Sequence, residues 1–255
     1  RKIWLMLVGL FTALTSGFMG TTLTFAEENE ASQTIEQPSY ISDFPNQVGH
    51  WQDLVGTAEK KNDSAGLWIA NTKQGTNLES VSINLDAREQ SSGDLELTFL
   101  YEGQSNFGLV FRGDKQKTSQ WQSFAYNRDG RWQLGQPGGK WLTNIPGPTL
   151  LSGQQYKLLV RYDGKKIQTF LNDQLFYENE EVHYPDGTSI NDDWMGAVGI
   201  RLFGNLSKLN IISMKSGPVG SIPVIDSSAE YRELKEKWRN QLVSKEYDST
   251  NQALV

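Results

Sequence analysis

The sequence predicts an all-β protein built as an antiparallel sandwich of the jelly-roll type, followed by one short helix at its C-terminal end. Three observations support this fold class. Between residues 46 and 217, about a dozen short strand-like runs alternate with turn signals. No long helical pattern separates these runs, which favours antiparallel pairing. The region is also longer than an immunoglobulin-sized sandwich, so a double-sheet jelly roll fits it better.

The strands are identified by runs in which apolar and polar residues alternate. In DLELTFLY, Leu95, Leu97 and Phe99 share one face, because successive side chains of a strand point to opposite sides of the sheet. The same alternation continues through LESVSINLD, FGLVFR, WQSFAYNRDGRWQL, YKLLVRYDGKKIQTFLNDQLFYE, AVGIRLFG and LSKLNIISMK. Three residue pairs between runs predict tight hairpin turns, whose central positions need positive φ: Asp129-Gly130, Asp163-Gly164 and Asn172-Asp173.

The N-terminal residues 1–26 have the pattern of a secretory signal peptide. Arg1 and Lys2 precede an apolar run, and the small residues Thr24 and Ala26 lead into an acidic stretch. The run is also long enough to be a retained membrane anchor. We expect cleavage and an extracellular protein that meets the membrane only through this segment. Residues 27–45 are polar without periodicity, which predicts a flexible lead-in.

Composition narrows the class of protein further. The 24 basic and 30 acidic residues give a net charge of −6, which argues against a nucleic-acid binder. The chain has no cysteine, so no disulfide stabilises it. An exported protein without cysteine suits a Gram-positive bacterium. We expect a monomer.

The strand pattern ends in SGPVGSIPVIDSS, which predicts a linker over residues 218–227. Ser227 and Glu230 then form a capping box at the start of a helix. An apolar stripe follows at helical spacing, made of Tyr231, Leu234, Trp238 and Leu242. A lone helix is marginal in water, so this one either folds back on the sandwich or begins a second domain. We expect the second, over residues 228–255.

The run AEYRELKEKWRNQLVSKEYDST resembles the opening of the α-helical domain of polysaccharide lyase family 8, the hyaluronate and chondroitin lyases. The match rests on Glu230, Tyr231, Leu234, Trp238, Arg239 and Tyr247-Asp248. NFGLVFRG, YKLLVRYDGKKIQTFLN and AVGIRLFG resemble the concanavalin-like sandwich modules found beside glycan-degrading domains. The resemblance implies a secreted enzyme that cleaves hyaluronan or a related glycosaminoglycan by β-elimination. Residues 46–217 would be its carbohydrate-binding domain, and residues 228–255 the first helix of a truncated α/α toroid.

No catalytic residue is expected within this chain. The family's catalytic Asn, His and Tyr lie on the toroid downstream of the matching stretch. A sandwich glycoside hydrolase, one alternative, needs two carboxylates about 5 Å apart on one strand face. The chain has no E-x-D-x-E run, and Glu178, Glu180 and Glu181 fit a charged turn. The other alternative is a stand-alone surface lectin or adhesin domain.

A carbohydrate site is predicted between Asn106 and Trp141. Six basic and two acidic residues give this stretch a net charge of +4, and four large aromatics are interleaved with them. Aromatic rings stack on the C–H faces of sugars, and guanidinium groups pair with carboxylates. The predicted residues for an anionic polysaccharide are Arg112, Trp121, Tyr126, Arg128, Arg131, Trp132 and Trp141. We expect Arg128, Arg131 and Trp132 to be solvent-accessible at a hairpin tip.

Each of these aromatics also fits a core position. Trp121 and Tyr126 fall on opposite faces of one strand, so they do not point the same way. The loop PDGTSINDDW supplies hard oxygen ligands that suit calcium, and the candidate metal ligands are Asp186, Asn191 and Asp193. No cofactor is required; a structural calcium ion is the one metal expected.

Overall fold

The structure is a computed structural model that describes residues 39–41, 48–64, 66–71, 78–225 and 228–252. The predicted signal segment, the lead-in apart from residues 39–41, and Ser227 of the capping box lie outside the described residues. In the part of the chain that is described, no helix is both apolar and long enough to span a membrane.

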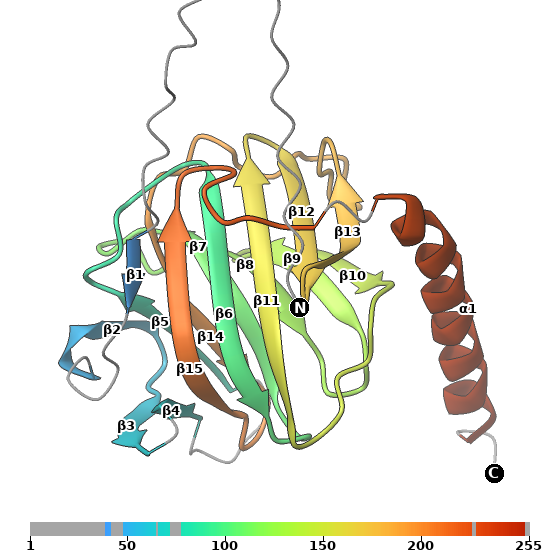
Figure 1. Cartoon of the computed structure of the whole chain (residues 1–255), viewed down its shortest axis with the longest axis horizontal. Helices are drawn as coiled ribbons and strands as arrows, with labels where there is room; N and C mark the ends of the chain where they lie inside the picture. Colours follow the sequence, from blue (N-terminus) through green and yellow to red (C-terminus); the bar gives the residue numbers. More distant parts are fainter. Residues whose placement is uncertain (1–38, 42–47, 65, 72–77, 226–227, 253–255) are drawn as a thin grey trace, which may run out of the picture. The chain divides into compact units, whose positions relative to one another are not determined.

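Two antiparallel sheets form a sandwich, as predicted (Figure 1). The larger sheet has the order β13-β12-β11-β6-β15-β4-β3, and β1 pairs with β15. Its strands are β1 (Ser39–Ile41), β3 (Glu59–Asp63), β4 (Gly66–Ala70), β6 (Gly93–Tyr101), β11 (Gln154–Asp163), β12 (Lys166–Leu171), β13 (Gln174–Asn179) and β15 (Lys208–Gly217). Strand β1 lies inside the range 27–45 that was expected to be flexible.

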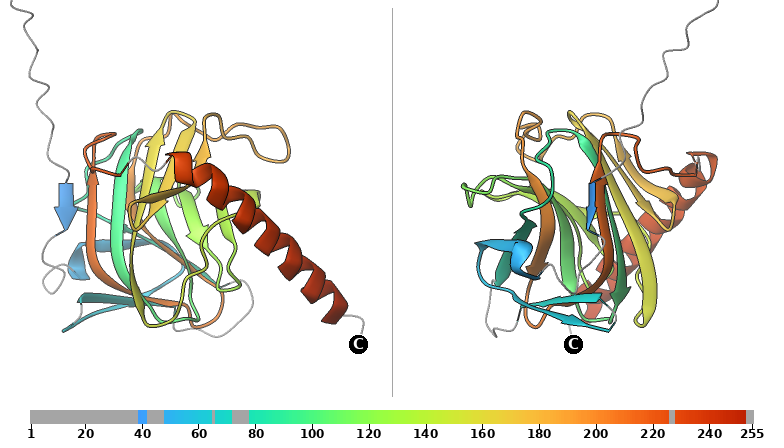
Figure 2. Two further views of the ribbon diagram at one scale, coloured as in Figure 1. Left: turned by 45° about the vertical axis from the view of Figure 1, so that its right-hand side comes forward. Right: turned by 60° about the vertical axis from the view of Figure 1, so that its left-hand side comes forward.

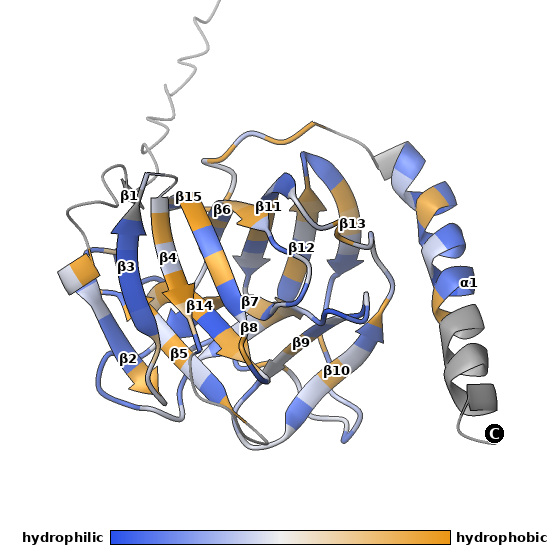
Figure 3. Cartoon of the chain, turned by 90° about the horizontal axis from the view of Figure 1, so that it is seen from below, coloured by the Kyte–Doolittle hydropathy of each residue, from blue (hydrophilic) through white to orange (hydrophobic). Residues whose placement is uncertain are grey.

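The smaller sheet has the order β10-β9-β8-β7-β14-β5-β2. Its strands are β2 (Trp51–Val55), β5 (Glu79–Asn84), β7 (Asn106–Gly113), β8 (Gln122–Tyr126), β9 (Trp132–Gln136), β10 (Lys140–Ile145) and β14 (Ala197–Phe203). A short 3-10 helix, η2 (Val48–His50), precedes β2. Apolar and polar residues alternate along the strands, as Figure 3 shows, so each sheet has one apolar face to bury.

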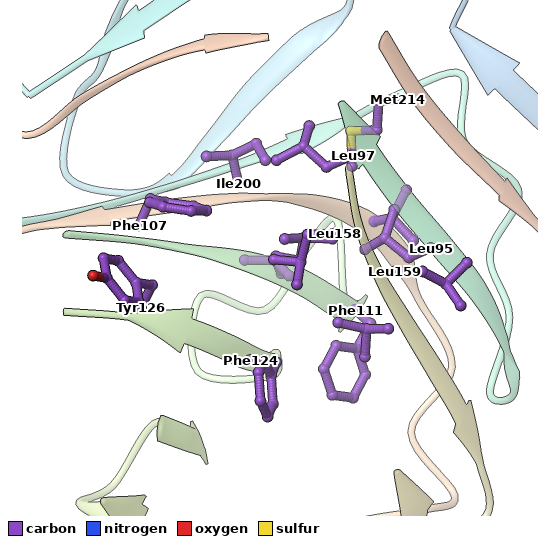
Figure 4. Close-up of a cluster of buried hydrophobic side chains, with 14 of the residues drawn as sticks. Leu95, Leu97, Phe107, Phe111, Phe124, Tyr126, Leu158, Leu159, Ile200 and Met214 are labelled. Carbon is purple, nitrogen blue, oxygen red and sulfur yellow. The ribbon is translucent and has the colours of Figure 1, made fainter. Parts of the chain in front are cut away.

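The core lies between the two sheets (Figure 4). The predicted face of Leu95, Leu97 and Phe99 has no solvent exposure. Across the sandwich, the ring of Phe99 meets that of Phe107 with centroids 4.8 Å apart. Aromatic pairs of this kind add to the free energy gained by burying apolar area.

The three predicted turns differ in which of their residues have positive φ. Both Asn172 and Asp173 have positive φ, of 51° and 68°, which is the tight turn predicted between β12 and β13. At the other two turns only the glycine has positive φ. Asp163 is still in β11, paired with Lys166, so the turn there is one residue further along the chain than expected.

Arg112 is buried, so the prediction that it binds a glycan is wrong. Its side chain has no solvent exposure, and its backbone φ is 55° near a register shift between β7 and β14. The guanidinium donates to the carbonyl oxygens of Ser91 (2.6 Å), Gly164 (2.7 Å) and Asn191 (3.1 Å), and to Oε1 of Gln122 (2.9 Å). Burial lowers the pKa of Arg112 from its usual value. The residue therefore joins four separate segments from within.

The predicted linker is fixed to the larger sheet at Ile222. The carboxylate of the buried Asp94 accepts two bonds from Arg161, of 2.7 and 2.8 Å, and a third from the backbone N–H of Ile222 at 3.0 Å. Arg161 also donates to the carbonyl of Ile222 at 2.9 Å. This four-bond arrangement, the Asp94 clamp, ties residue 222 to β6 and β11.

The helix α1 (Ser228–Gln252) lies beside β13 (Figure 1, Figure 2). Tyr231 and Trp238 of the predicted stripe are buried. The hydroxyl of Tyr231 accepts a bond from the N–H of Glu178 at 3.2 Å, and the Trp238 ring meets Phe176 edge-on at 6.2 Å. The stripe thus packs on the sandwich, which is the fold-back contact of the first alternative. That α1 begins a second domain stays a prediction.

Replacing Arg112 with leucine should lower the free energy of unfolding by more than about 3 kcal/mol, because buried oxygen atoms lose their donors. Chemical denaturation of the full chain measures the change. The exposed Arg128 is the matched control, and Arg128→Leu should change stability by less than about 0.5 kcal/mol. Equal effects of the two substitutions would contradict the structural role of Arg112.

Trp238→Ala should lower the free energy of unfolding by about 3 kcal/mol, because the indole is buried against Phe176. The neighbouring Arg239 is exposed and pairs with the exposed Glu236, so Arg239→Ala should cost less than about 0.5 kcal/mol. Thermal and chemical unfolding of both variants test this. An unchanged free energy of unfolding in Trp238→Ala would show that α1 adds no stability to the sandwich.

Candidate functional site

A cleft of about 370 Å³ lies on the outer face of the smaller sheet. Ile200 and Leu202 of β14 point into the core, so Arg201 between them points to the outside. Trp141 of β10 and the segment before β8 complete the walls. The lining residues are Val55, Glu79, Thr118, Ser119, Trp121, Pro137, Gly138, Gly139, Trp141 and Arg201.

Arg201 lines this cleft and contacts two aromatic rings. Its guanidinium carbon lies 4.2 Å from the ring centroids of both Trp141 and Phe203, and its Nε donates to Oε1 of Glu79 at 2.5 Å. Only 7% of the residue is exposed, and burial lowers the pKa of Arg201 while the charge of Glu79 opposes that shift. Among the residues that the structure describes, its buried Nη1 has no hydrogen-bond partner.

Trp141 is half-buried and lies flat on the sheet because of Gly135. The two residues are cross-strand partners of β10 and β9. A Cβ atom on Gly135 would lie 2.2 Å from Cε3 of the indole, so a side chain there would displace the ring. The ring of Trp121 lies 6.2 Å from that of Trp141, and its Nε1 donates to the carbonyl of Thr118 at 3.1 Å. The indole platform is therefore fixed before any ligand arrives.

The arrangement suits a ligand that has both apolar and polar surface. The half-buried indole of Trp141 offers a flat face for C–H groups. The side chain of Glu79 is 31% exposed and accepts hydrogen bonds, while Arg201 donates them. A sugar ring presents this combination of C–H faces and hydroxyl groups.

Two of the predicted aromatic residues meet at the cleft, and two do not. Trp121 and Trp141 both line it, although Trp121 is only 2% exposed. Tyr126 and Trp132 are core residues, and the prediction that Trp132 is solvent-accessible is wrong. The Trp132 ring stacks on Phe124 at 5.6 Å, and its Nε1 donates to the carbonyl of Pro148 at 2.9 Å.

Arg128 and Arg131 are exposed at the β8–β9 turn, as predicted, but neither lines the cleft. The guanidinium of Arg131 pairs with the carboxylate of Asp129, with Nε at 2.8 Å, and also contacts Oδ1 of Asn144 at 3.2 Å. Its charge is therefore balanced by a neighbour. These two arginines stay candidates for ligand contact outside the cleft.

Sequence reasoning missed Glu79 and Arg201. They are 122 positions apart, and the pairing of β5 with β14 brings them together. One signal was present in the sequence: Arg201 is the only charged residue of the apolar run AVGIRLFG. A charge in such a run needs a partner if its face is covered.

Two of the three predicted calcium ligands, Asp186 and Asn191, are engaged in protein contacts. Oδ1 of Asp186 accepts bonds from the N–H and the hydroxyl of Thr188, at 3.0 and 2.7 Å. The backbone carbonyl of Asn191 accepts from Arg112 and Gln122. Asp193 is exposed. Among the residues that the structure describes, no group of three or more His, Cys, Asp or Glu is placed to hold a metal ion. Calcium at this loop stays a prediction.

Comparison with known proteins bears on both the fold and the predicted resemblance. No protein-family model matches the chain. The chain is 99% identical over all 255 residues to the hyaluronate lyase HylB of Enterococcus faecalis (strain ATCC 700802 / V583), and it spans 25% of that protein's length. This identity confirms the predicted resemblance to a hyaluronate lyase.

Two solved structures resemble the sandwich. One is a protein of unknown function with a galectin-like fold from Bacillus subtilis, with a TM-score of 0.52 and 13% identity, covering 71% of this chain and 96% of that one. The other is the carbohydrate-binding module CBM66 from Bacillus subtilis, with a TM-score of 0.45 and 16% identity, covering 62% of this chain and 94% of that one. The first likeness supports a galectin-like sandwich fold.

Gly135→Ala should displace the Trp141 indole and lower the free energy of unfolding by about 1–3 kcal/mol, because the added methyl group overlaps the ring. Near-ultraviolet circular dichroism follows the indole, and denaturation follows stability. Gly49→Ala is the control, since a Cβ there meets nothing within 4 Å. An unchanged indole signal in Gly135→Ala would contradict the described packing of Trp141.

Proposed function

We propose that this chain is the glycan-binding segment of a secreted polysaccharide lyase that acts on hyaluronan or a related glycosaminoglycan. Its near-identity to a quarter of HylB supports the enzyme class. The observation that carries the binding role is the stack of Arg201 between Trp141 and Phe203, 4.2 Å from each ring, inside an open cleft.

The cleft would hold one sugar unit of the polymer. The C–H face of the sugar rests on Trp141, and its hydroxyl groups bond to the carboxylate of Glu79. The guanidinium of Arg201, which lines the cleft, would attract an acidic or acetamido oxygen of the sugar. Because Arg201 is already paired with Glu79, the cleft is close to neutral. Stacking and hydrogen bonding then contribute more to affinity than net charge does.

In this proposal the segment binds the polymer and the rest of the enzyme cleaves it. The catalytic Asn, His and Tyr of the lyase family that this chain resembles have no counterpart in the matching stretch. Tethering a binding module to a catalytic domain raises the effective concentration of substrate near the catalytic groups. Residues 1–26, with their signal-peptide pattern, support export to the extracellular space, where this class of polymer is found.

Trp141→Ala should weaken binding of hyaluronan oligosaccharides to the full chain at least about tenfold, or about 1.4 kcal/mol, because the stacking platform is lost. Isothermal titration calorimetry measures both proteins, and retained circular dichroism shows that the fold survives. Arg131→Ala, outside the cleft, should change the binding free energy by less than about 0.5 kcal/mol. The reverse result, with only Arg131→Ala weakened, would move the site to the hairpin tip. No binding by the unaltered chain would overturn the proposed ligand.

A further inference from the structure

A second cleft of about 460 Å³ lies on the outer face of the larger sheet, and we propose that it binds an uncharged sugar residue. Leu67 and Ile69 of β4 face the core, so Trp68 between them faces outward. The volume falls within the range of about 300–1,000 Å³ that is usual for small-ligand sites. The side chains used below are Trp68, Asn71, Glu102, Gln104, Leu206 and Lys208.

Buried hydrogen bonds hold the walls of this cleft in place. Ser207 is fully buried, and its hydroxyl donates to the carbonyl of Phe203 at 2.6 Å and accepts from the N–H of Asn106 at 3.1 Å. The carbonyl of Ser207 accepts from the N–H of Asn71 at 2.8 Å. The hydroxyl of Ser105 accepts from the N–H of Lys208 at 3.1 Å. Three separate segments are thus joined, and a ligand meets a cleft that is already formed.

Two features of Leu206, at the rim of this cleft, are energetically unfavourable. Its φ of 54° lies in the left-handed region, which side chains other than glycine rarely adopt. The same side chain is 56% exposed, although it is a large apolar group. Strained backbone that persists in a well-bonded segment points to a functional site. Beside Trp68, Leu206 gives the cleft a second apolar surface that a sugar ring can cover.

The polar groups of the cleft favour an uncharged ligand. Glu102 and Lys208 form an ion pair across it, so their charges cancel. Asn71 and Gln104 add two carboxamides, which both donate and accept hydrogen bonds. Asn71 is buried, and its Nδ2 makes a long bond of 3.5 Å to the carbonyl of Gly204. Hydroxyl and acetamido groups match this set of hydrogen-bond donors and acceptors.

Trp68 itself is held in place from the neighbouring strand. Lys61 is its cross-strand partner in β3, and the ammonium of Lys61 lies 4.2 Å from the indole centroid. A cation at this distance from an indole is attracted to it. The proposal goes beyond the glycan cleft around Trp141, because the two clefts lie on different sheets and share no lining residue.

The test uses the full chain carrying Trp141→Ala, so that the first cleft does not contribute. Uncharged N,N′-diacetylchitobiose is titrated and followed by the indole N–H signals in nuclear magnetic resonance, with glucuronic acid as the anionic comparison. We expect diacetylchitobiose to shift the Trp68 indole signal and Trp68→Ala to weaken its binding at least tenfold. Absence of binding, equal affinity in Trp68→Ala, or tighter binding of glucuronic acid would each overturn the proposal.

Leu206→Gly, in the same background, separates function from folding. Glycine accepts the positive φ without strain, so the melting temperature should stay the same or rise. Binding of diacetylchitobiose should nevertheless fall about fivefold, because the apolar rim is lost. An unchanged affinity would show that Leu206 serves the turn alone and would remove it from the proposed site. Together with equal affinity in Trp68→Ala, it would leave this cleft with no role in sugar binding.

Discussion

The buried guanidinium of Arg112 is the constraint on which the rest of this sandwich depends. Its bonds go to the carbonyl groups of Ser91, Gly164 and Asn191 and to the side chain of Gln122. Ser91 lies just before β6, Gly164 lies in the β11–β12 turn, and Asn191 precedes β14. Because buried donors and acceptors must stay paired, these connections cannot move independently. Both sheets are therefore tied together at one end without any disulfide, in a chain that has no cysteine.

The proposed glycan cleft around Trp141 also contains a buried charge that is held by specific partners, here on the outside of the smaller sheet. A charge is covered by aromatic rings and is neutralised by one partner, Glu79, while glycine leaves the space that a ring needs. The absence of a side chain at Gly135 is as important here as the presence of the indole at Trp141, because a Cβ atom would overlap that ring. The site is thus specified by cross-strand register, because β9, β10, β5 and β14 each contribute one element of it.

Much of the fold is predictable from the sequence because strands repeat every two residues. That period places Leu97 in the core, and the residue types between two strand runs identify the Asn172-Asp173 turn. The candidate site is less predictable, because a period of two does not say which face is covered. The position of Trp132 beside a turn predicts an exposed side chain. Because β9 begins at Trp132, the indole instead points into the core. The pairing of Arg201 with a carboxylate 122 positions away depends on sheet order, which local pattern does not reveal.

The Asp94 clamp also determines how mechanical force passes through this protein. The sandwich and α1 lie on opposite sides of residue 222 along the chain, and there Asp94 and Arg161 hold the backbone by both its N–H and its carbonyl group. The clamp joins the segment to two central strands, β6 and β11, which are bonded to neighbours on both sides. Pulling on α1 after its contacts with β13 separate would therefore stretch several hydrogen bonds at once, and the sandwich would resist extension as a unit.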